Sequence, residues 1–346
     1  MTDTGVATIH DVAQRAGVAV SSVSRVLNEH PDVSAAMRKR VLEAAQALGY
    51  SPDPVARSLR SGSTRTVGYV VRDFENPLFL ENIQGVEETL TKAGYTLLVT
   101  NSGGDPDREV ERIQVLKRRR VDALVLSSIS DRSAATRRAV SQFSGPVVLL
   151  DRDLGKVAAG NVHLDHAAGV YAATADLISL GHRRIALITG TTDIRPTRER
   201  LRGYTEAHLD AGLDPVPDLQ VTGQFSSSAF RSSTISLLRK PASKRPTAIL
   251  AGGIQSTAGV LEGLSDLGIR IPDDLSLVVC DDLPWLRTLR PRVSVVTRDP
   301  AEMGRSAAQM ALSMIAGEDP TTVVLSTSYE PRETSAPPPA KAPRPR

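Results

Sequence analysis

The sequence predicts two fold classes in one chain, a small all-α helix-turn-helix domain followed by an α/β domain of two Rossmann-like lobes. Residues 8–28 carry two short apolar stripes at helical spacing, separated by Gly17. From Thr66 onward, strand-like runs alternate with helical patterns, and this series occurs twice in tandem. The chain of 346 residues is long enough to give each domain a core of its own.

The composition is that of an ordinary soluble protein, with 40% hydrophobic and 23% charged residues. The net charge is only +3, so affinity for nucleic acid must come from local clusters of basic residues. Cys280 is the one cysteine, which excludes a disulfide framework and fits a reducing compartment. The N-terminus has no signal-peptide pattern, and no apolar run approaches the roughly 18 residues of a membrane span. We therefore expect a cytoplasmic protein without a membrane partner.

The first helix is predicted to begin at Thr8, because Thr8 is a good N-cap and Asp11 completes a capping box. Gly17 supplies the backbone freedom that the end of this helix requires. The second helix is predicted to turn Val20, Ser21, Ser22 and Arg25 outward, a face of small polar groups, one valine and one arginine. Such a face suits the reading of base edges in a major groove. A plain helical hairpin with solvated side chains is the alternative.

A third helix is predicted over residues 35–48, with Ser34 as its N-cap and Gly49 at its end. Its basic cluster, residues 38–40, is either a solvated face or a phosphate contact beside the helix N-terminus. Residues 53–60 resemble one or two further turns of helix, which are marginal alone. A Gly/Ser linker follows. The expected domains are 1–50 (helix-turn-helix), 51–65 (hinge helix and linker), 66–335 (two lobes) and 336–346 (a disordered, Pro-rich and basic tail).

The N-terminal segment TIHDVAQRAGVAVSSVSRVLN resembles the head of the LacI/GalR family of bacterial transcription regulators. The similarity continues through Val33-Ser34 and Tyr50-Ser51-Pro52 to the segment ARSLR at 56–60, and it covers nearly the whole chain. It implies a sequence-specific DNA-binding regulator, in its commonest form a repressor, controlled by a small-molecule effector. It also implies a homodimer on a pseudo-palindromic operator, because dimer symmetry sets half-site symmetry.

The resemblance also assigns roles to residues of the head. The first exposed positions of the second helix contact bases, Arg25 contacts guanine or phosphate, and Leu59 wedges into the minor groove. The full set of expected DNA-binding residues is Thr8, Val20, Ser21, Ser22, Arg25, Asn28, Ser34, Ala56 and Leu59.

By the same resemblance, the α/β domain is periplasmic-binding-protein-like, with a cleft between its lobes. Lobe 1 is expected at about 66–163 and 292–322, and lobe 2 at about 164–291 and 323–335. The expected strands are 67–71, 96–100, 123–127, 147–151, 185–189, one near 219, 248–250, 277–280, 293–297 and 323–325. The expected helices are 79–93, 107–120, 197–211, 226–238 and 257–267.

Ligands in such folds bind at the carboxyl ends of strands, where loops converge. This rule and the resemblance together select an expected effector site of Phe79, Asp151, Arg152, Arg198, Arg200, Phe225, Asp282 and Arg298. For each residue, a surface or interlobe ion pair is the alternative. Gly253-Ile254 stands where relatives commonly have Asn-Asp, so a hydroxyl-binding group is missing. The effector is expected to be a sugar or sugar derivative; the arginines favour a phosphorylated or acidic one, unless the pocket is degenerate.

Two other classes of function compete with this interpretation. One is a small-molecule binding protein with a vestigial DNA-binding head. The other is a doubly wound enzyme, which is disfavoured because residues 73–77 stand where a Gly-rich dinucleotide fingerprint would lie, and because no P-loop or nucleophile elbow occurs. His163 and His166 come nearest to a metal spacing without a third ligand, so we expect loop histidines. No catalytic residue, metal or cofactor is expected.

Overall fold

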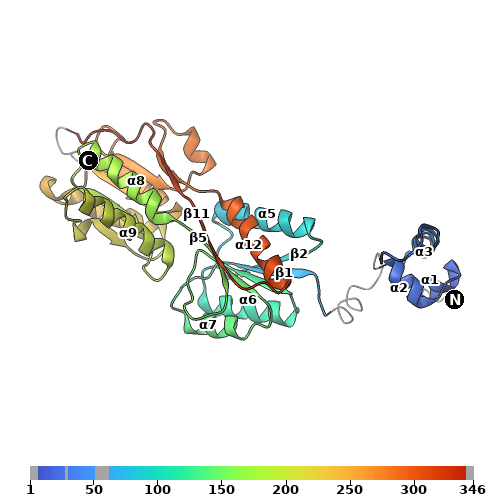
Figure 1. The fold of residues 1–346 in the computed structure, drawn as a ribbon. Coiled ribbons are helices and arrows are strands. Elements are labelled where there is room, and N and C mark those ends of the chain that lie inside the picture. Colours follow the sequence, from blue (N-terminus) through green and yellow to red (C-terminus); the bar gives the residue numbers. More distant parts are fainter. Residues whose placement is uncertain (1–6, 28–29, 51–61, 340–346) are drawn as a thin grey trace. The chain divides into compact units, whose positions relative to one another are not determined.

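The computed structural model describes residues 7–27, 30–50 and 62–339, and the chain separates into two compact units, Met1–Arg65 and Thr66–Arg346. Figure 1 shows the course of the chain through both units. Two parts of the head that were expected to contact DNA lie outside the described residues: Asn28, and the expected hinge helix with Ala56 and Leu59.

The described residues of the first unit form three helices, α1 (Ile9–Ala16), α2 (Val20–Leu27) and α3 (Ala35–Ala47). The predicted capping box is confirmed: the backbone N–H of Thr8 donates to the Asp11 carboxylate at 2.8 Å, and the Thr8 hydroxyl accepts from the Asp11 backbone N–H. Gly17 ends α1 with a φ of 63°, in the left-handed region that glycine tolerates. All three helices contribute to one small core, centred on the fully buried Val12, Val23 and Val41.

The second unit is built around two six-stranded sheets. The first sheet contains β1 (Thr66–Val71), β2 (Thr96–Asn101), β3 (Ala123–Leu126), β4 (Val147–Leu150), β5 (Gly160–Leu164) and β11 (Thr322–Leu325). They are all parallel, in the order β11-β5-β4-β3-β1-β2. The second contains β6 (Ile185–Thr189), β7 (Gln220–Thr222), β8 (Ala248–Ala251), β9 (Ser276–Cys280), β10 (Ser294–Thr297) and β12 (Ser328–Glu330). Its order is β12-β10-β9-β8-β6-β7, with β12 antiparallel to β10.

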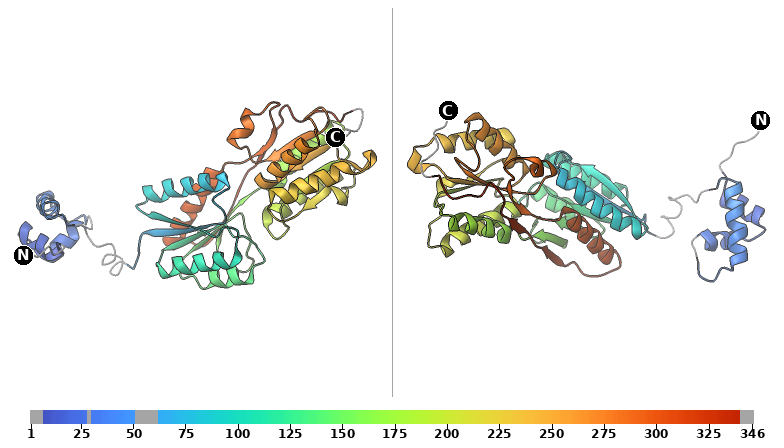
Figure 2. Two further views of the ribbon diagram at one scale, coloured as in Figure 1. Left: turned by 180° about the vertical axis from the view of Figure 1, so that it is seen from behind. Right: turned by 90° about the horizontal axis from the view of Figure 1, so that it is seen from above.

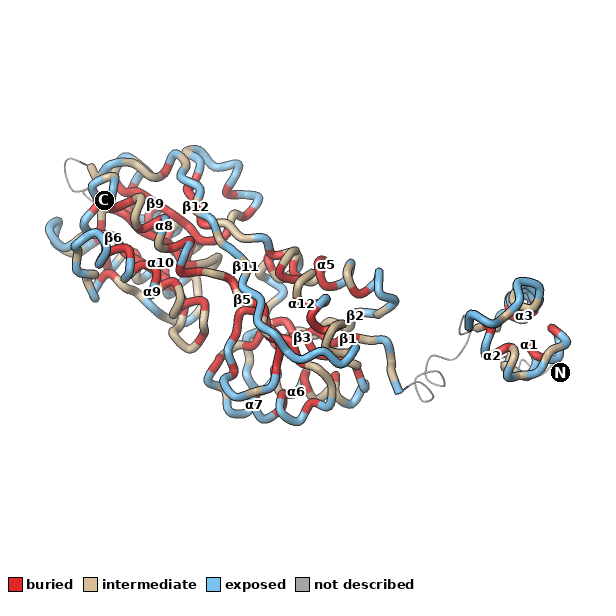
Figure 3. The backbone as a smooth tube through the Cα atoms, in the orientation of Figure 1, coloured by how far each residue is buried: buried red, intermediate tan, exposed pale blue. Residues whose placement is uncertain are grey.

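Helices cover both faces of each sheet (Figures 1 and 2). In lobe 1, the first sheet lies between the pair α5 (Pro77–Lys92) and α12 (Pro300–Ile315) and the pair α6 (Pro106–Arg118) and α7 (Ala134–Ser141). In lobe 2, the second sheet lies between α8 (His166–Ser179) with α9 (Arg195–Asp210) and α10 (Ser227–Arg239) with α11 (Ile254–Asp266). The central strands are accordingly buried, whereas the edge strands β2, β7, β11 and β12 and the outer helix faces are more exposed (Figure 3). This is the layered arrangement that strand–helix alternation predicts.

The chain crosses between the lobes three times, after β5, after β10 and after β11. The predicted crossings near 292 and near 322 are therefore wrong by several residues. The strand Ser294–Thr297 pairs with β9 in lobe 2, and the strand Thr322–Leu325 pairs with β5 in lobe 1. Both are short β-branched runs, so their periodicity does not reveal which sheet they join.

Several elements were not predicted from the sequence, namely α7, α8, α12, β5 and β12. The prediction that residues 336–346 are disordered is wrong for the first of them, Ala336. The Ala336 carbonyl lies 2.8 Å from His182 Nε2, and its backbone N–H donates to the Ser276 hydroxyl at 3.1 Å. Composition averaged over the tail does not reveal one anchored residue; residues 340–346 lie outside the described part. In the described ranges, no helix has the length and apolarity needed to cross a bilayer.

Candidate functional site

A cavity of about 110 Å³ lies between the two lobes, where the carboxyl ends of their parallel strands meet. An outer cleft of about 730 Å³ shares four residues with it, Arg72, Asp73, Phe225 and Gln255. Six of the expected effector residues line the inner cavity: Phe79, Asp151, Arg152, Arg200, Phe225 and Arg298. The expected set therefore includes six residues that line this cavity, whereas the structure places Asp282 and Arg198 outside it.

Asp282 does not line the cavity. Its carboxylate accepts hydrogen bonds from Arg332 at 2.8 Å and from Arg287 at 3.1 Å. The preceding Asp281 lines the cavity instead, with a φ of 81°, and it accepts from Arg298 Nε at 2.7 Å. The backbone conformation of the turn decides which of the two adjacent aspartates faces inward, and the sequence does not state it.

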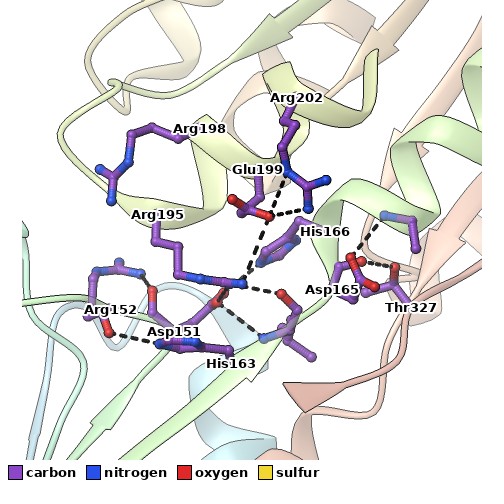
Figure 4. Close-up of polar contacts among 12 residues, drawn as sticks. Asp151, Arg152, His163, Asp165, His166, Arg195, Arg198, Glu199, Arg202 and Thr327 are labelled. Carbon is purple, nitrogen blue, oxygen red and sulfur yellow. Dashed lines mark hydrogen bonds and ion pairs between the residues drawn. The ribbon is translucent and has the colours of Figure 1, made fainter. Parts of the chain in front are cut away.

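Arg198 also lies outside the inner cavity. Its guanidinium donates to Asp131 at 2.8 Å and to the Thr192 carbonyl at 3.0 Å. Figure 4 shows no contact between Arg198 and Asp151, whereas Arg195 reaches that carboxylate at 3.2 Å. The arginines in the first turns of α9 therefore differ in their contacts: Arg195 and Arg198 bind carboxylates, and only Arg200 lines the inner cavity.

The contacts around Asp131 join the lobes beside the cavity, and we call Asp131, Asp193, Arg195 and Arg198 the interlobe latch. Asp131 follows β3 in lobe 1, and the other three precede or begin α9 in lobe 2. One Asp131 carboxylate oxygen accepts from the Arg195 backbone N–H at 2.6 Å and from Arg198 at 2.8 Å. The other accepts from the Asp153 backbone N–H at 3.2 Å. The backbone N–H of Asp131 donates to the Asp193 carbonyl at 2.9 Å, so its polar groups are paired.

A buried Asp151–His166 pair lies between the latch and the cavity, with 2.6 Å between a carboxylate oxygen and Nε2. Burial alone would raise the pKa of Asp151, but His166, Arg152 and Arg298 outweigh it and hold that pKa below its ordinary value. Burial lowers the pKa of His166. The carboxylate is therefore ionised, and it accepts a hydrogen bond from His166 Nε2.

The prediction that His163 and His166 are loop histidines is wrong. His163 lies within β5, where its Nε2 is 3.1 Å from the Arg152 carbonyl, and His166 begins α8. Within the part of the chain that the structure describes, no three His, Cys, Asp or Glu side chains are grouped so as to hold a metal ion.

Phe225 is not an open platform for a sugar ring. The guanidinium of Arg72 lies 4.1 Å from the ring centroid and covers one face. Burial and the nearby Arg152 lower the pKa of Arg72 to about 10. An effector would contact Phe225 together with Arg72 rather than stack on a free ring.

Several lining residues were missed by sequence reasoning, namely Arg72, Asn82, Ser127, His166, Gln255 and Asp281. Arg72, Ser127 and Asp281 directly follow β1, β3 and β9, so the strand-end rule applied throughout would have found them. Asn82 lies within α5, and no sequence signal indicated it.

Gly252 lines the cavity at a point where a side chain would not fit. A Cβ at this position would lie 2.5 Å from the Thr189 hydroxyl and 3.2 Å from Cδ of Arg200. Glycine therefore leaves room for the Arg200 side chain to pass into the cavity.

In the head, Ser21 is exposed and Ser22 half-buried on the expected outward face of α2. Val20 does not simply face outward, because it is half-buried and packs against the core of the head. Arg25 is half exposed, and its guanidinium lies 3.3 Å from both the Asp32 carboxylate and His30 Nδ1. Ser34 caps α3 as predicted, by accepting from the Met37 backbone N–H at 3.4 Å.

A small helical head followed by a two-lobed domain with an interlobe cavity is the architecture expected of a ligand-responsive transcription regulator. The family comparisons agree with this class. Residues 8–53 match the family described as bacterial regulatory proteins, lacI family, and residues 174–335 match the periplasmic binding protein-like domain.

Known proteins are similar over nearly the full length. The HTH-type transcriptional repressor PurR of Aliivibrio fischeri (strain MJ11) is 32% identical over 90% of this chain and 93% of its own. The ribose operon repressor of Haemophilus influenzae is 34% identical over 95% and 98%. The solved structure of the transcriptional regulator CelR–cellobiose complex is 31% identical, with a TM-score of 0.71 over 95% of this chain and 99% of that one. The lac repressor dimer bound to operator has a TM-score of 0.82, over 96% and 100%, at 23% identity and thus supports the fold.

The chain belongs to the lacI family of bacterial regulatory proteins. It is a DNA-binding transcriptional repressor whose operator affinity is controlled by a small-molecule effector. Its relatives are transcription regulators rather than enzymes.

Proposed function

We propose that this chain is a cytoplasmic homodimer that binds a pseudo-palindromic operator through its two heads and binds a sugar or sugar derivative between its lobes. The observation that carries the effector site is the interlobe cavity, because both lobes supply charged side chains to it. Arg72 and Asp151 come from lobe 1, and Arg200 and Asp281 come from lobe 2. A ligand that touches both lobes binds the closed state better than an open one, which is the differential affinity that control of a second site requires.

A direct backbone route supports coupling between effector and operator. Strand β1 begins at Thr66, next to the linker that leads to the head, and Arg72 follows its other end in the cavity. A change of lobe closure around a ligand at Arg72 would thus act on the strand that continues into the linker. The curated ribose operon repressor and the CelR–cellobiose complex support a sugar-derived effector for this chain.

For operator recognition, we propose that Thr8, Ser21, Ser22, Arg25 and Ser34 contact DNA. The half-buried Val20 would meet a base only by its exposed edge. Arg25 would exchange its exposed ion pair with Asp32 for a base or phosphate, at small cost because exposed pairs contribute little. Asn28, Ala56 and Leu59 complete the expected set.

The experiment that tests this proposal is the selection of bound sequences from random duplex DNA with the full chain, followed by titration at two salt concentrations. The expected result is an enriched palindromic motif to which the chain still binds specifically at the higher salt concentration. Binding that is only non-specific and falls steeply with salt would favour a small-molecule binding protein with a vestigial head.

A further inference from the structure

We infer that the interlobe cavity takes a small hydroxylated oxyanion, a carboxylate or a phosphate ester, whose negative group contacts Arg200 and whose hydroxyl donates to Asn82. This inference rests on the proposed function and adds the chemical class of the effector.

Arg200 provides the first observation. Arg200 is only 5% exposed, and its Nε has no hydrogen-bond partner. No carboxylate of the described residues forms an ion pair with it. A buried charge without a partner is costly, and a guanidinium is suited to binding a carboxylate or phosphate through two parallel hydrogen bonds.

The carboxylates that line the cavity already have partners. Asp281 accepts from Arg298 at 2.7 Å, and Asp151 accepts from His166 at 2.6 Å and from Arg195 at 3.2 Å. Asp73 accepts from the Glu75 backbone N–H at 2.7 Å. These contacts leave the positive charge of Arg200 for a group that the chain does not supply.

Two more arginines extend the positive side of the cavity. Arg152 donates to the carbonyls of Ser128 and Asp151, and Arg72 lies over the Phe225 ring. Neither forms an ion pair within the described residues. Burial lowers the pKa of both, Arg152 further lowers that of Arg72, and Arg200 lowers that of Arg152, although Asp151, Asp131 and Glu109 act on Arg152 in the opposite direction and more strongly. An anion relieves the repulsion between the arginines, whereas a neutral sugar leaves it in place.

Asn82 provides an independent observation. Asn82 is 4% exposed and lines the same cavity, and its Oδ1 accepts no hydrogen bond. A ligand that satisfies both groups needs a hydroxyl that donates to Asn82 and an acceptor for the Arg200 N–H, and an oxyanion is the acceptor that also compensates the buried charge. The volume of about 110 Å³ restricts the inner part of such a ligand to a few carbon atoms, and any remainder would extend into the outer cleft.

The test is thermal unfolding of the full chain with three probe sets at equal concentration and ionic strength. The sets are neutral aldoses from tetrose to hexose, aldonates with the same carbon skeletons, and phosphate esters of the same aldoses. We expect one of the two anionic sets to raise Tm by several degrees and the neutral set to raise it much less. The set that acts identifies the oxyanion as carboxylate or phosphate.

Variants locate the response. Arg200→Gln keeps most of the side-chain volume without the charge and is expected to remove the shift. The matched control is Arg202→Gln, on the exposed side of the same helix, where the shift should persist. Asn82→Asp adds a carboxylate to the cavity and is expected to weaken the anion response, so the inference remains testable if Arg200→Gln fails to fold.

Three results would overturn the inference: a neutral set that stabilises as much as the anionic sets, no stabilisation by any set, or an anion response that Arg200→Gln and Asn82→Asp both retain. Failure of the proposed function looks different. Anions that raise Tm without altering operator binding would contradict effector control. Neutral sugars that alter operator binding would support effector control and overturn the inference that the effector is an oxyanion.

Discussion

The interlobe latch and the inner cavity are adjacent and charged, yet the cavity contains buried polar groups without a partner, whereas the polar groups of Asp131 at the latch are paired. At the latch, both carboxylate oxygens of Asp131 have donors within the chain. In the cavity, Arg200 Nε and Asn82 Oδ1 have no partner. Helix α9 contributes to both regions, with Arg195 and Arg198 in the latch and Arg200 in the cavity. The paired groups of the latch join the two lobes, and we propose that the two unpaired groups of the cavity meet the ligand.

The largest expected effect follows from removing the unpaired charge. Arg200→Gln should weaken binding of the active anion by at least about 30-fold, because truncating one partner of a buried charge contact costs about 2 kcal/mol or more. Isothermal titration calorimetry measures this loss, with Arg202→Gln as the control. Equal affinity in Arg200→Gln and the wild-type chain would show that the cavity arginine does not meet the ligand.

Gly252→Ala should disturb the cavity without changing any charge. The added Cβ would displace Thr189 or Arg200, and such overpacking costs about 1–3 kcal/mol. We expect anion binding to weaken by about tenfold. Gly223→Ala is the matched control, since a Cβ there has no atom within 4 Å. If both variants bind equally well, the close approach at Gly252 does not position Arg200.

Asp131→Asn should loosen the latch while leaving the cavity lining intact. It removes the charge that Arg198 pairs with and weakens the bond from the Arg195 backbone N–H, at a cost of about 1–3 kcal/mol. Amide hydrogen exchange at Arg195 should become faster. Arg132→Gln breaks only the exposed pair with Asp193 and should leave this exchange nearly unchanged. Unchanged protection of Arg195 in Asp131→Asn would mean that the latch does not hold the lobes.

The smallest effect concerns pH and the Asp151–His166 pair, which lies between the two regions. Burial holds the pKa of His166 below its ordinary value of 6.5, so the unfolded chain binds a proton before the folded chain does. The free energy of unfolding should therefore fall as pH decreases from 6.5 toward the folded pKa. His166→Gln should reduce this slope without abolishing it, because burial also lowers the pKa values of His182 and His208. Urea unfolding at several pH values measures the slope, and an identical slope in the variant would contradict the assignment.

Much of the architecture could be predicted because it follows from local patterns. The strand–helix alternation predicted the parallel sheets, and Thr8, Asp11 and Gly17 predicted how α1 begins and ends. The strand-end rule placed Asp151 and Arg152 at the cavity, since both follow β4. These features depend on neighbours in sequence, which the sequence displays directly.

The remaining features depend on contacts between distant segments. The choice of Asp281 over Asp282 follows from one left-handed residue, and the choice of Arg200 over Arg198 follows from the orientation of α9 against Asp131. Strands β10 and β11 carry no local signal of the sheet that they join. The half-buried position of Val20 likewise follows from packing among three helices.

The most direct test of the account compares operator binding by the wild-type chain and Arg200→Gln, on a duplex enriched by selection, with and without the anionic probe that raises Tm. The account predicts that the probe changes the operator Kd of the wild-type chain at least about tenfold, the size of an ordinary allosteric coupling. In Arg200→Gln, the same probe should leave the Kd at that variant's own probe-free value. An equal change of operator Kd in both proteins would contradict the claim that the effector acts through this cavity.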